Sequence, residues 1–203
     1  MKLSVCSAPK GRPREFCTDK ALAAALRVFW SKGYEGASMA DLTEAMGITK
    51  PSLYAAFGNK EALFAKALDL YEAEKLAYTR TALDKPTAKG VAEAILRGAL
   101  ANMTGKNEPH GCLGVISSMA CGAEAEPIKA AVLERRASSQ RAVVERFLRA
   151  KEEGDLPAHV DAQALTGYLF AILQGLAVQA GSGASCEALG RVVDTSMMVW
   201  PSN

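Results

Sequence analysis

A lysine, a serine and a tyrosine stand close together on one short stretch of the chain. The stretch KPSLYAAF, residues 50–57, carries Lys50, Ser52 and Tyr54, with Pro51 near its start and Gly58 directly after it. A helix between that proline and that glycine can be barely two turns long, whereas isolated helices need roughly 12–15 residues even to be marginally stable in water. The stretch is therefore predicted to be held by neighbouring elements, and its outer face offers these side chains to the major groove of DNA.

The residues before this stretch are those that a sharp turn between two helices requires. Two short helices joined by MGITK, residues 46–50, are typical of a helix-turn-helix. Gly47 permits the positive φ of the turn, and Thr49 is predicted to cap the second helix, whose first turn tolerates Pro51. Ile48 and Leu53 would point back into a small core. A plain helical hairpin with no DNA partner remains the alternative interpretation.

Two further residues are placed to hold phosphates. Ser38 is predicted to cap the preceding helix, with Asp41 three residues later as in a capping box. Because backbone N–H groups are free at a helix N-terminus, a phosphate could sit there. Lys60 stands at the start of the next helix, which Asn59 would cap, and forms a second candidate phosphate site.

Composition predicts an all-α protein with a basic N-terminal end. Hydrophobic residues make up 49% of the 203 residues, mostly alanine and leucine, and aromatic residues only 6%. Residues 1–60 hold nine Lys/Arg and five Asp/Glu, a net charge of +4, and residues 61–203 hold fifteen and seventeen, a net charge of −2. A basic end on a nearly neutral body suits a polyanionic partner.

Cysteine usage and hydropathy indicate a cytoplasmic protein. The five cysteines form no CxxC pair, and their odd number argues against a secreted disulfide scaffold. We find no apolar run that approaches the 18 or more residues of a membrane span, so no membrane partner is expected.

Helical periodicity and breakers divide the chain into a head and a body. The first helix is expected to follow an N-cap at Thr18 and to end at Gly33, and the fourth to run from Asn59 to about Arg80. Body helices are expected over 87–103, a short apolar segment near 112–122, 126–152, 161–180 and 185–199. We therefore divide the chain into an arm and DNA-binding domain, residues 1–60, and a ligand-binding and dimerisation domain, residues 61–203, linked by the helix over 59–80.

The segment ALRVFWSKGYEGASMADLTEAMGITKPSLYAAFGNKEALFAKAL closely resembles the DNA-binding head of the tetracycline-repressor (TetR) family, and the resemblance is strong over roughly residues 12–70. It implies a homodimeric repressor of about nine helices per subunit, with a variable ligand-binding body. The residues that would face DNA by position, together with the cap of their helix, are Thr49, Lys50, Pro51, Ser52 and Tyr54, and Lys60 would hold a phosphate. The family position four before the turn glycine is usually alanine and is Thr43 here.

Some features of the head suggest how an operator would be read. Ala55 and Ala56 occupy places where some relatives carry larger groove-reading side chains, so part of the specificity is expected to come from DNA shape. In the arm, Arg12 and Arg14 could reach the flanking minor groove. A tail that only keeps the protein soluble is the alternative for the arm.

The stretch EPHGCLGVISSMACG carries the candidate sensor of a signal. Cys112 follows His110 at a predicted helix start, and a helix N-terminus favours the thiolate. Cys112, assisted by His110, could therefore sense electrophiles, quinones or oxidants. The alternatives are a small buried residue, or a soft-metal site that adds Met103 and Met119, although nothing fixes the geometry of such a site. We predict no metal and no cofactor.

Cys121 lies nine residues after Cys112, too far along one helix for a direct disulfide, so a bridge would need Cys186, a partner subunit or a small thiol. The effector would otherwise be a small molecule in an apolar cavity. Aromatic residues that could line it, although core packing is the stronger expectation for each, are Phe147, Tyr168, Phe170 and Trp200.

The last two helices are expected, by resemblance, to form the dimer interface, and ordinary packing within the subunit is the alternative for their small residues, Gly167, Ala171, Gly175 and Ala177. Two histidines and the lack of a phosphate-cradling glycine loop or HExxH argue against an enzyme. The predicted partner is a palindromic double-stranded DNA. A helical adaptor protein without sequence-specific DNA binding is the alternative function.

Overall fold

The computed structural model describes residues 16–119, 122 and 125–202, and within these ranges all regular structure is α-helical. The all-α prediction is confirmed. The described residues form ten helices: α1 (Thr18–Gly36), α2 (Met39–Met46), α3 (Lys50–Phe57), α4 (Lys60–Lys75), α5 (Ala77–Leu83), α6 (Ala88–Met103), α7 (Leu113–Ser118), α8 (Glu126–Glu152), α9 (Ala162–Gly181) and α10 (Cys186–Met198).

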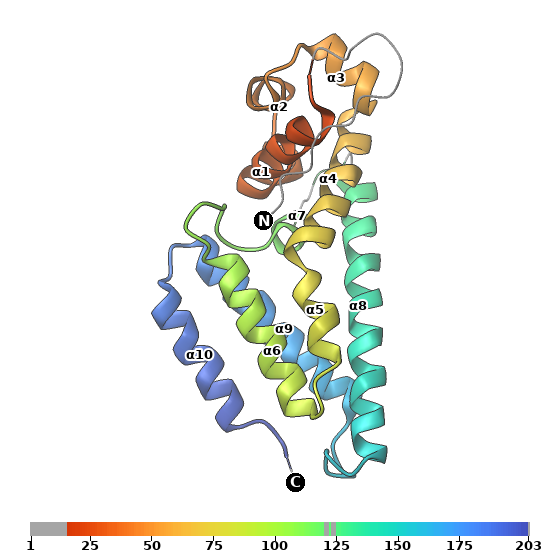
Figure 1. Ribbon diagram of the computed structural model, residues 1–203, viewed down its shortest axis with the longest axis vertical. Helices are drawn as coiled ribbons and strands as arrows, with labels where there is room; N and C mark the ends of the chain where they lie inside the picture. The colour runs from red at the N-terminus through yellow and green to blue at the C-terminus, as the bar shows by residue number, and fades with distance from the viewer. Residues whose placement is uncertain (1–15, 120–121, 123–124, 203) are drawn as a thin grey trace.

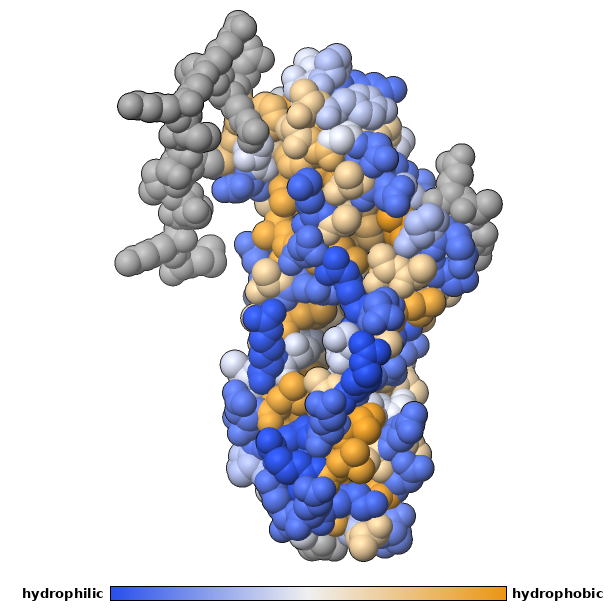
Figure 2. Space-filling view, turned by 90° about the vertical axis from the view of Figure 1, so that its right-hand side faces the viewer, coloured by the Kyte–Doolittle hydropathy of each residue, from blue (hydrophilic) through white to orange (hydrophobic). Residues whose placement is uncertain are grey.

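The molecule is elongated, with a three-helix head at one end (Figure 1). The head consists of α1, α2 and α3, and α4 leads from it toward the body beside the long helix α8. At the opposite end, α5, α6, α9 and α10 form the body, with short α7 lying between head and body. The face seen in Figure 2 carries hydrophilic side chains along its middle, with apolar atoms showing between them.

The predicted caps set the boundaries of the head helices. The hydroxyl of Ser38 accepts a hydrogen bond from the N–H of Asp41, and the Asp41 carboxylate accepts one from the N–H of Ser38, which completes a capping box. Thr49 caps α3 and Asn59 caps α4 through their side-chain oxygens. Local sequence therefore fixes where each short helix starts.

Two expectations for the helices need correction. The N-cap of α1 is Cys17 rather than Thr18, and its side chain makes no capping bond, so the helix starts one residue earlier than the threonine signal indicates. The helix expected over 59–80 is interrupted at Leu76, where φ is −105° and ψ is 8°. This break produces α4 and α5 and accounts for ten helices instead of about nine.

The physical reason for the break lies in the body. After Leu76 the chain turns so that the ring of Tyr78 lies against the backbone of α6 at Gly98, where any side chain would collide with that ring.

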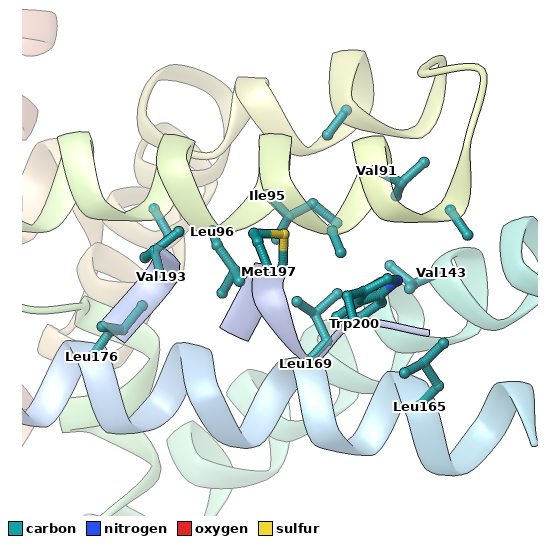
Figure 3. Close-up of a cluster of buried hydrophobic side chains, with 14 of the residues drawn as sticks. Val91, Ile95, Leu96, Val143, Leu165, Leu169, Leu176, Val193, Met197 and Trp200 are labelled. Carbon is teal, nitrogen blue, oxygen red and sulfur yellow. The ribbon is translucent and has the colours of Figure 1, made fainter. Parts of the chain in front are cut away.

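Buried side chains gather in two cores. The head core holds residues of α1 to α4 and takes in Leu113, Ile128 and Val132 from α7 and α8. The body core lies between α6, α8, α9 and α10 (Figure 3), where Ile95, Leu169 and Met197 face one another around Trp200. Cys112 packs against both cores.

The expectation that no apolar run approaches the length of a membrane span needs correction at helix α9. Over 18 of its 20 residues the mean hydropathy is 1.3, so by length and composition alone it could cross a membrane. A third of that window, 33%, is buried inside the molecule, and α9 packs on α6, α8 and α10. Because core helices of soluble proteins pass the same test, this feature is weak evidence for a membrane partner.

Candidate nucleic-acid interface and ligand cavity

The turn between α2 and α3 is closed by backbone hydrogen bonds. Gly47 lies in the left-handed region, with φ 64° and ψ 32°, and its N–H donates to the carbonyl of Glu44. The N–H of Ile48 donates to the carbonyl of Thr43. A Cβ at Gly47 would meet nothing within 4 Å, so the requirement for glycine is the backbone conformation and not space.

Helix α3 has one face in the head core and one face in solvent. Leu53 and Phe57 are buried. Lys50 and Pro51 are exposed, Tyr54 is 47% exposed, and Ser52 is half-buried. The Lys50 ammonium lies 6.0 Å from the centre of the Tyr54 ring. Lys50 and Tyr54 are therefore exposed next to each other on α3.

Thr49 and Ser52 form one small hydroxyl pair at the start of this face. Their oxygens lie 2.9 Å apart, and Thr49 also accepts from the N–H of Ser52 at 3.3 Å. The shared bond uses one hydroxyl hydrogen, so the other can be donated to an outside acceptor.

Ser38 is exposed at the N-terminus of α2, but its hydroxyl donates to the Asp41 carboxylate at 2.8 Å. Lys32 forms an ion pair with the same carboxylate at 2.7 Å. These bonds, first that of Lys32 and then those of Ser38, lower the pKa of Asp41 from 3.8 to about 2. A phosphate at this terminus would therefore meet backbone N–H groups rather than a free serine hydroxyl.

Lys60 begins α4, directly after the cap at Asn59. Its ammonium lies 4.5 Å from the centre of the Tyr34 ring, which positions the cation by a cation–π contact. Arg12 and Arg14, by contrast, lie outside the described residues.

A cavity of about 450 Å³ lies where the two cores meet. Its lining comes from α4 to α9 and from the residues that join them. The apolar part of the lining consists of Leu68, Leu76, Leu83, Ile95, Met103, Val115, Val132, Ala142, Val143, Phe170 and Leu173. The polar part includes Tyr71, Cys112 and Gln174, and the charged part is Glu72, Arg80, Arg135 and Arg136.

Cys112 lies in this cavity as the N-cap of α7, and its thiol is not in a disulfide. The hydroxyl of Tyr71 donates to its sulfur at 3.5 Å and accepts from the Asn102 amide at 3.3 Å. Burial, and next the neighbouring Cys112, raises the pKa of Tyr71 well above its ordinary value, so the phenol remains a proton donor. His110 is exposed and is not among the residues that line the cavity.

The other candidate residues of the body do not lie together in the structure. Phe170 lines the cavity, whereas Phe147 and Trp200 are buried in the body core and Tyr168 is 42% exposed. Cys186 is exposed and is not in a disulfide, and Cys121 lies outside the described residues. Among the residues that the structure describes, no three His, Cys, Asp or Glu side chains come together as a metal site.

Contacts that the sequence does not reveal join the head to the cavity wall. The indole N–H of Trp30, in α1, donates to the carbonyl of Gly111 at 3.2 Å, and the Trp30 ring packs edge-on against Tyr71. Glu108 forms ion pairs with Arg27 at 2.9 Å and with Lys75 at 2.7 Å. The partners of Glu108 lie 33 and 81 residues away along the chain, so sequence alone cannot pair them. The one sequence signal of such a connection is the run of polar residues before Cys112.

Exposed apolar side chains gather on the last two helices and the residue that follows them. They are Tyr168, Val178, Val192, Met198 and Val199, five of the nine large hydrophobic residues that are exposed in the described chain. Gly167 and Ala171 are also exposed, whereas Ala177 is buried. Its carbonyl lies close to Gly111, so Ala177 serves packing within the subunit.

Comparison with known proteins accounts for both parts of the chain. Residues 21–67 match the model of the bacterial regulatory proteins of the tetR family, and residues 92–195 match that of a tetracyclin repressor-like C-terminal domain. The HTH-type transcriptional repressor ComR of Escherichia coli K12 is 35% identical over 195 residues, which cover 95% of this chain and 92% of ComR. The regulator YezE of Bacillus subtilis 168 is 31% identical and covers 93% and 98%.

A solved structure agrees with these relatives. It is a cysteine mutant of the TetR family transcriptional regulator CifR, complexed with a 26 bp double-strand operator DNA. The two chains are 42% identical and superpose with a TM-score of 0.89, over 94% of this chain and 100% of the CifR chain. This chain therefore belongs to the tetR family of bacterial regulatory proteins, which are DNA-binding transcriptional regulators and not enzymes.

Proposed function

We propose that the protein is a cytoplasmic repressor that binds a palindromic double-stranded operator as a homodimer, with α3 of each subunit in a major groove. The observation that carries the proposal is the free face of α3, on which Lys50, Ser52 and Tyr54 project beside a closed helix-turn-helix turn. The comparison with a relative bound to operator DNA supports it. In this proposal the division into residues 1–60 and 61–203 separates DNA binding from ligand binding and dimerisation, and α4 connects them.

The proposed DNA contacts are of two kinds, those that read bases and those that hold the DNA backbone. Lys50, Ser52 and Tyr54 would read base edges or nearby phosphates, while Thr49 and Pro51 would set the approach of the helix. Lys60 and the N–H groups at the start of α2, beside Ser38, would hold phosphates. Arg12 and Arg14 would reach the flanking minor groove.

The proposed dimer interface is the exposed apolar face of α9 and α10. Tyr168, Val178 and Met198 lie on it, and Gly167 and Ala171 would let a partner helix approach closely. A second copy that covers this face would bury the apolar atoms that α9 otherwise exposes to water.

An effector in the cavity would reach the head through α7. The cavity wall includes Cys112 and Tyr71, and these adjoin Gly111 and Trp30. A ligand that shifts this wall would move α1 and so alter the spacing of the two heads, which must match grooves about 34–36 Å apart.

Cys112 is also proposed as a sensor of thiol-reactive compounds. It lines a cavity that such compounds could enter, and a Tyr71 hydroxyl donates to its sulfur. A quinone should release operator DNA from the parent protein and not from Cys112→Ser. Equal release from both proteins would refute the sensor role.

Genome-wide mapping of DNA bound by the protein tests the proposed repressor directly. Bound fragments should share a palindromic site, and deletion of the gene should raise transcription of the neighbouring genes. Purified protein should then bind that site with an affinity that falls steeply as salt rises. A helical adaptor without DNA specificity would yield no shared site.

A further inference from the structure

We propose that the cavity binds a small organic carboxylate with an apolar tail, and that the guanidinium of Arg136 holds the carboxylate. The binding of a carboxylate is independent of the proposed function, and only its role as an effector rests on that function. The size of the cavity, about 450 Å³, suits a small molecule, and its lining is apolar over most residues of α6 and α9. Such a lining matches an alkyl or aryl tail.

One of the three lining arginines is already neutralised. Arg135 forms ion pairs with Asp69 at 2.7 Å and with Glu72 at 2.8 Å, which join α8 to α4. Because Glu72 is the only acidic residue of the described lining and is used in this way, it does not balance the other two arginines.

Arg136 lacks such a partner. Its side chain is half-buried, and no carboxylate of the described residues lies within ion-pairing distance of it. Its Nη2 donates only to neutral oxygens, the Gly114 carbonyl at 3.3 Å and the Ser118 hydroxyl at 3.0 Å. Within the described residues its Nη1 and Nε donate to nothing, so three of the five N–H groups of the guanidinium remain available.

A carboxylate fits the Arg136 guanidinium in both charge and shape. Two parallel N–H···O bonds between a guanidinium and a carboxylate combine charge with planar geometry. Arg80 lines the same cavity, is exposed, and adds a second positive charge that attracts an anion toward it. The apolar residues Phe170 and Leu173, from α9, would then contact the tail.

The position of Arg136 also connects this ligand to the head. Both of its acceptors belong to α7, and α7 packs on α1, where Ile116 lies against Gly33. Every pair of parallel N–H groups on a guanidinium includes Nη2, so a carboxylate bound through two hydrogen bonds would compete with Gly114 and Ser118 and loosen α7 from α8. The ligand would thereby act on the helix that supports the DNA-reading head.

Calorimetric titration of the full-length protein with octanoate tests the site, with octanamide as the neutral analogue and acetate as the anion without a tail. We expect octanoate to bind at least about tenfold tighter than octanamide, and acetate to bind more weakly still, since a hydrogen bond to a charged group is worth roughly that ratio. Arg136→Met should abolish the preference for octanoate, and Arg136→Lys should retain part of it.

The matched control is Arg141→Met, an exposed arginine of the same helix that pairs with Glu134 outside the cavity and should leave octanoate binding unchanged. Equal affinity for octanoate and octanamide, no octanoate binding at millimolar concentration, or tighter binding of octyl phosphate would each overturn the carboxylate assignment. Octanoate that binds but leaves the operator complex intact would overturn the effector role. A protein that binds no operator in the absence of any ligand would instead contradict the proposed function.

Discussion

At the residue scale, Asp41 shows how one side chain holds the start of α2. Its carboxylate accepts from the Ser38 backbone and hydroxyl and pairs with Lys32, so its pKa is lowered from 3.8 to about 2. A carboxyl group whose pKa is lower in the folded protein stabilises the fold above its unfolded pKa, and this contribution is lost as the pH falls toward the folded value. The capping box of α2 is therefore sensitive to acid between about pH 4 and pH 2.

Carboxyl-detected NMR titration measures this directly. The Asp41 resonance should titrate near pH 2 in the parent protein, and Lys32→Met should move its midpoint upward toward 3.8. A parent resonance that titrates at the ordinary value would show that the ion pair and the capping box are not formed in solution.

Single residues also show what sequence could and could not reveal about the site. The shared burial of Leu53 and Phe57, four residues apart on α3, follows from helical spacing. The hydrogen bond from Tyr71 to Cys112 does not, because its partners are 41 residues apart. Sequence placed Cys112 correctly at a helix start, but it suggested His110 as the neighbour of the thiol, whereas the group that bonds the thiol is a phenol.

At the scale of the element, the helix-turn-helix depends on the backbone of Gly47. Alanine there would have to adopt φ near 64°, which costs about 1–2 kcal/mol in a residue with a Cβ. Gly47→Ala should therefore lower the free energy of unfolding, measured in urea, by that amount. The loss of stability would come from the backbone conformation alone, since the added methyl group would meet no neighbour.

Gly36→Ala provides the matched control in the same head. Gly36 does not have a positive φ, and a methyl group there would make only an ordinary contact with Lys32. Its free energy of unfolding should be unchanged or slightly higher. Similar destabilisation by both substitutions would contradict the special role of the turn.

Helix boundaries were predictable where a capping residue sets them. Ser38, Thr49 and Asn59 cap α2, α3 and α4 as their sequence pattern indicates. The break at Leu76 was not predictable, because no glycine or proline marks it and its cause is packing of Tyr78 on α6. The one local signal of that packing is Gly98 in the middle of a helix.

At the scale of the whole molecule, binding to a palindromic operator would require a dimer whose two heads bind together. Val178 is 51% exposed on the apolar face of α9, and a charge there would be buried without a partner in the proposed interface. Val178→Glu should therefore sediment as a folded monomer at low micromolar concentration, where the parent sediments as a dimer, and it should bind operator DNA far more weakly.

Leu148→Glu is the control for this substitution. Leu148 is 48% exposed on α8 and is not one of the exposed residues of α9 and α10, so its variant should remain dimeric. A Val178→Glu protein that stays dimeric would place the interface elsewhere.

In the whole molecule, the cavity lies at the junction between the head and the body. The head core and the body core meet at Cys112, and the ion pairs of Glu108 and Arg135 connect α1, α4 and α8 around that junction. Sequence predicted a head, a body and a linking helix. It could not predict this junction, because the lining of the cavity comes from six helices that are distant along the chain.

Fluorescence anisotropy of a labelled operator duplex tests the proposal that α3 reads operator DNA. The double variant Lys50→Ala/Tyr54→Ala should lose at least about thirtyfold in affinity, because each side chain that contacts a base or phosphate contributes about 1–3 kcal/mol. Lys85→Ala, in the loop between α5 and α6 at the far end of the body, should bind like the parent. A double variant that binds the operator as tightly as the parent and the Lys85→Ala control would contradict the assignment of α3 as the reading helix.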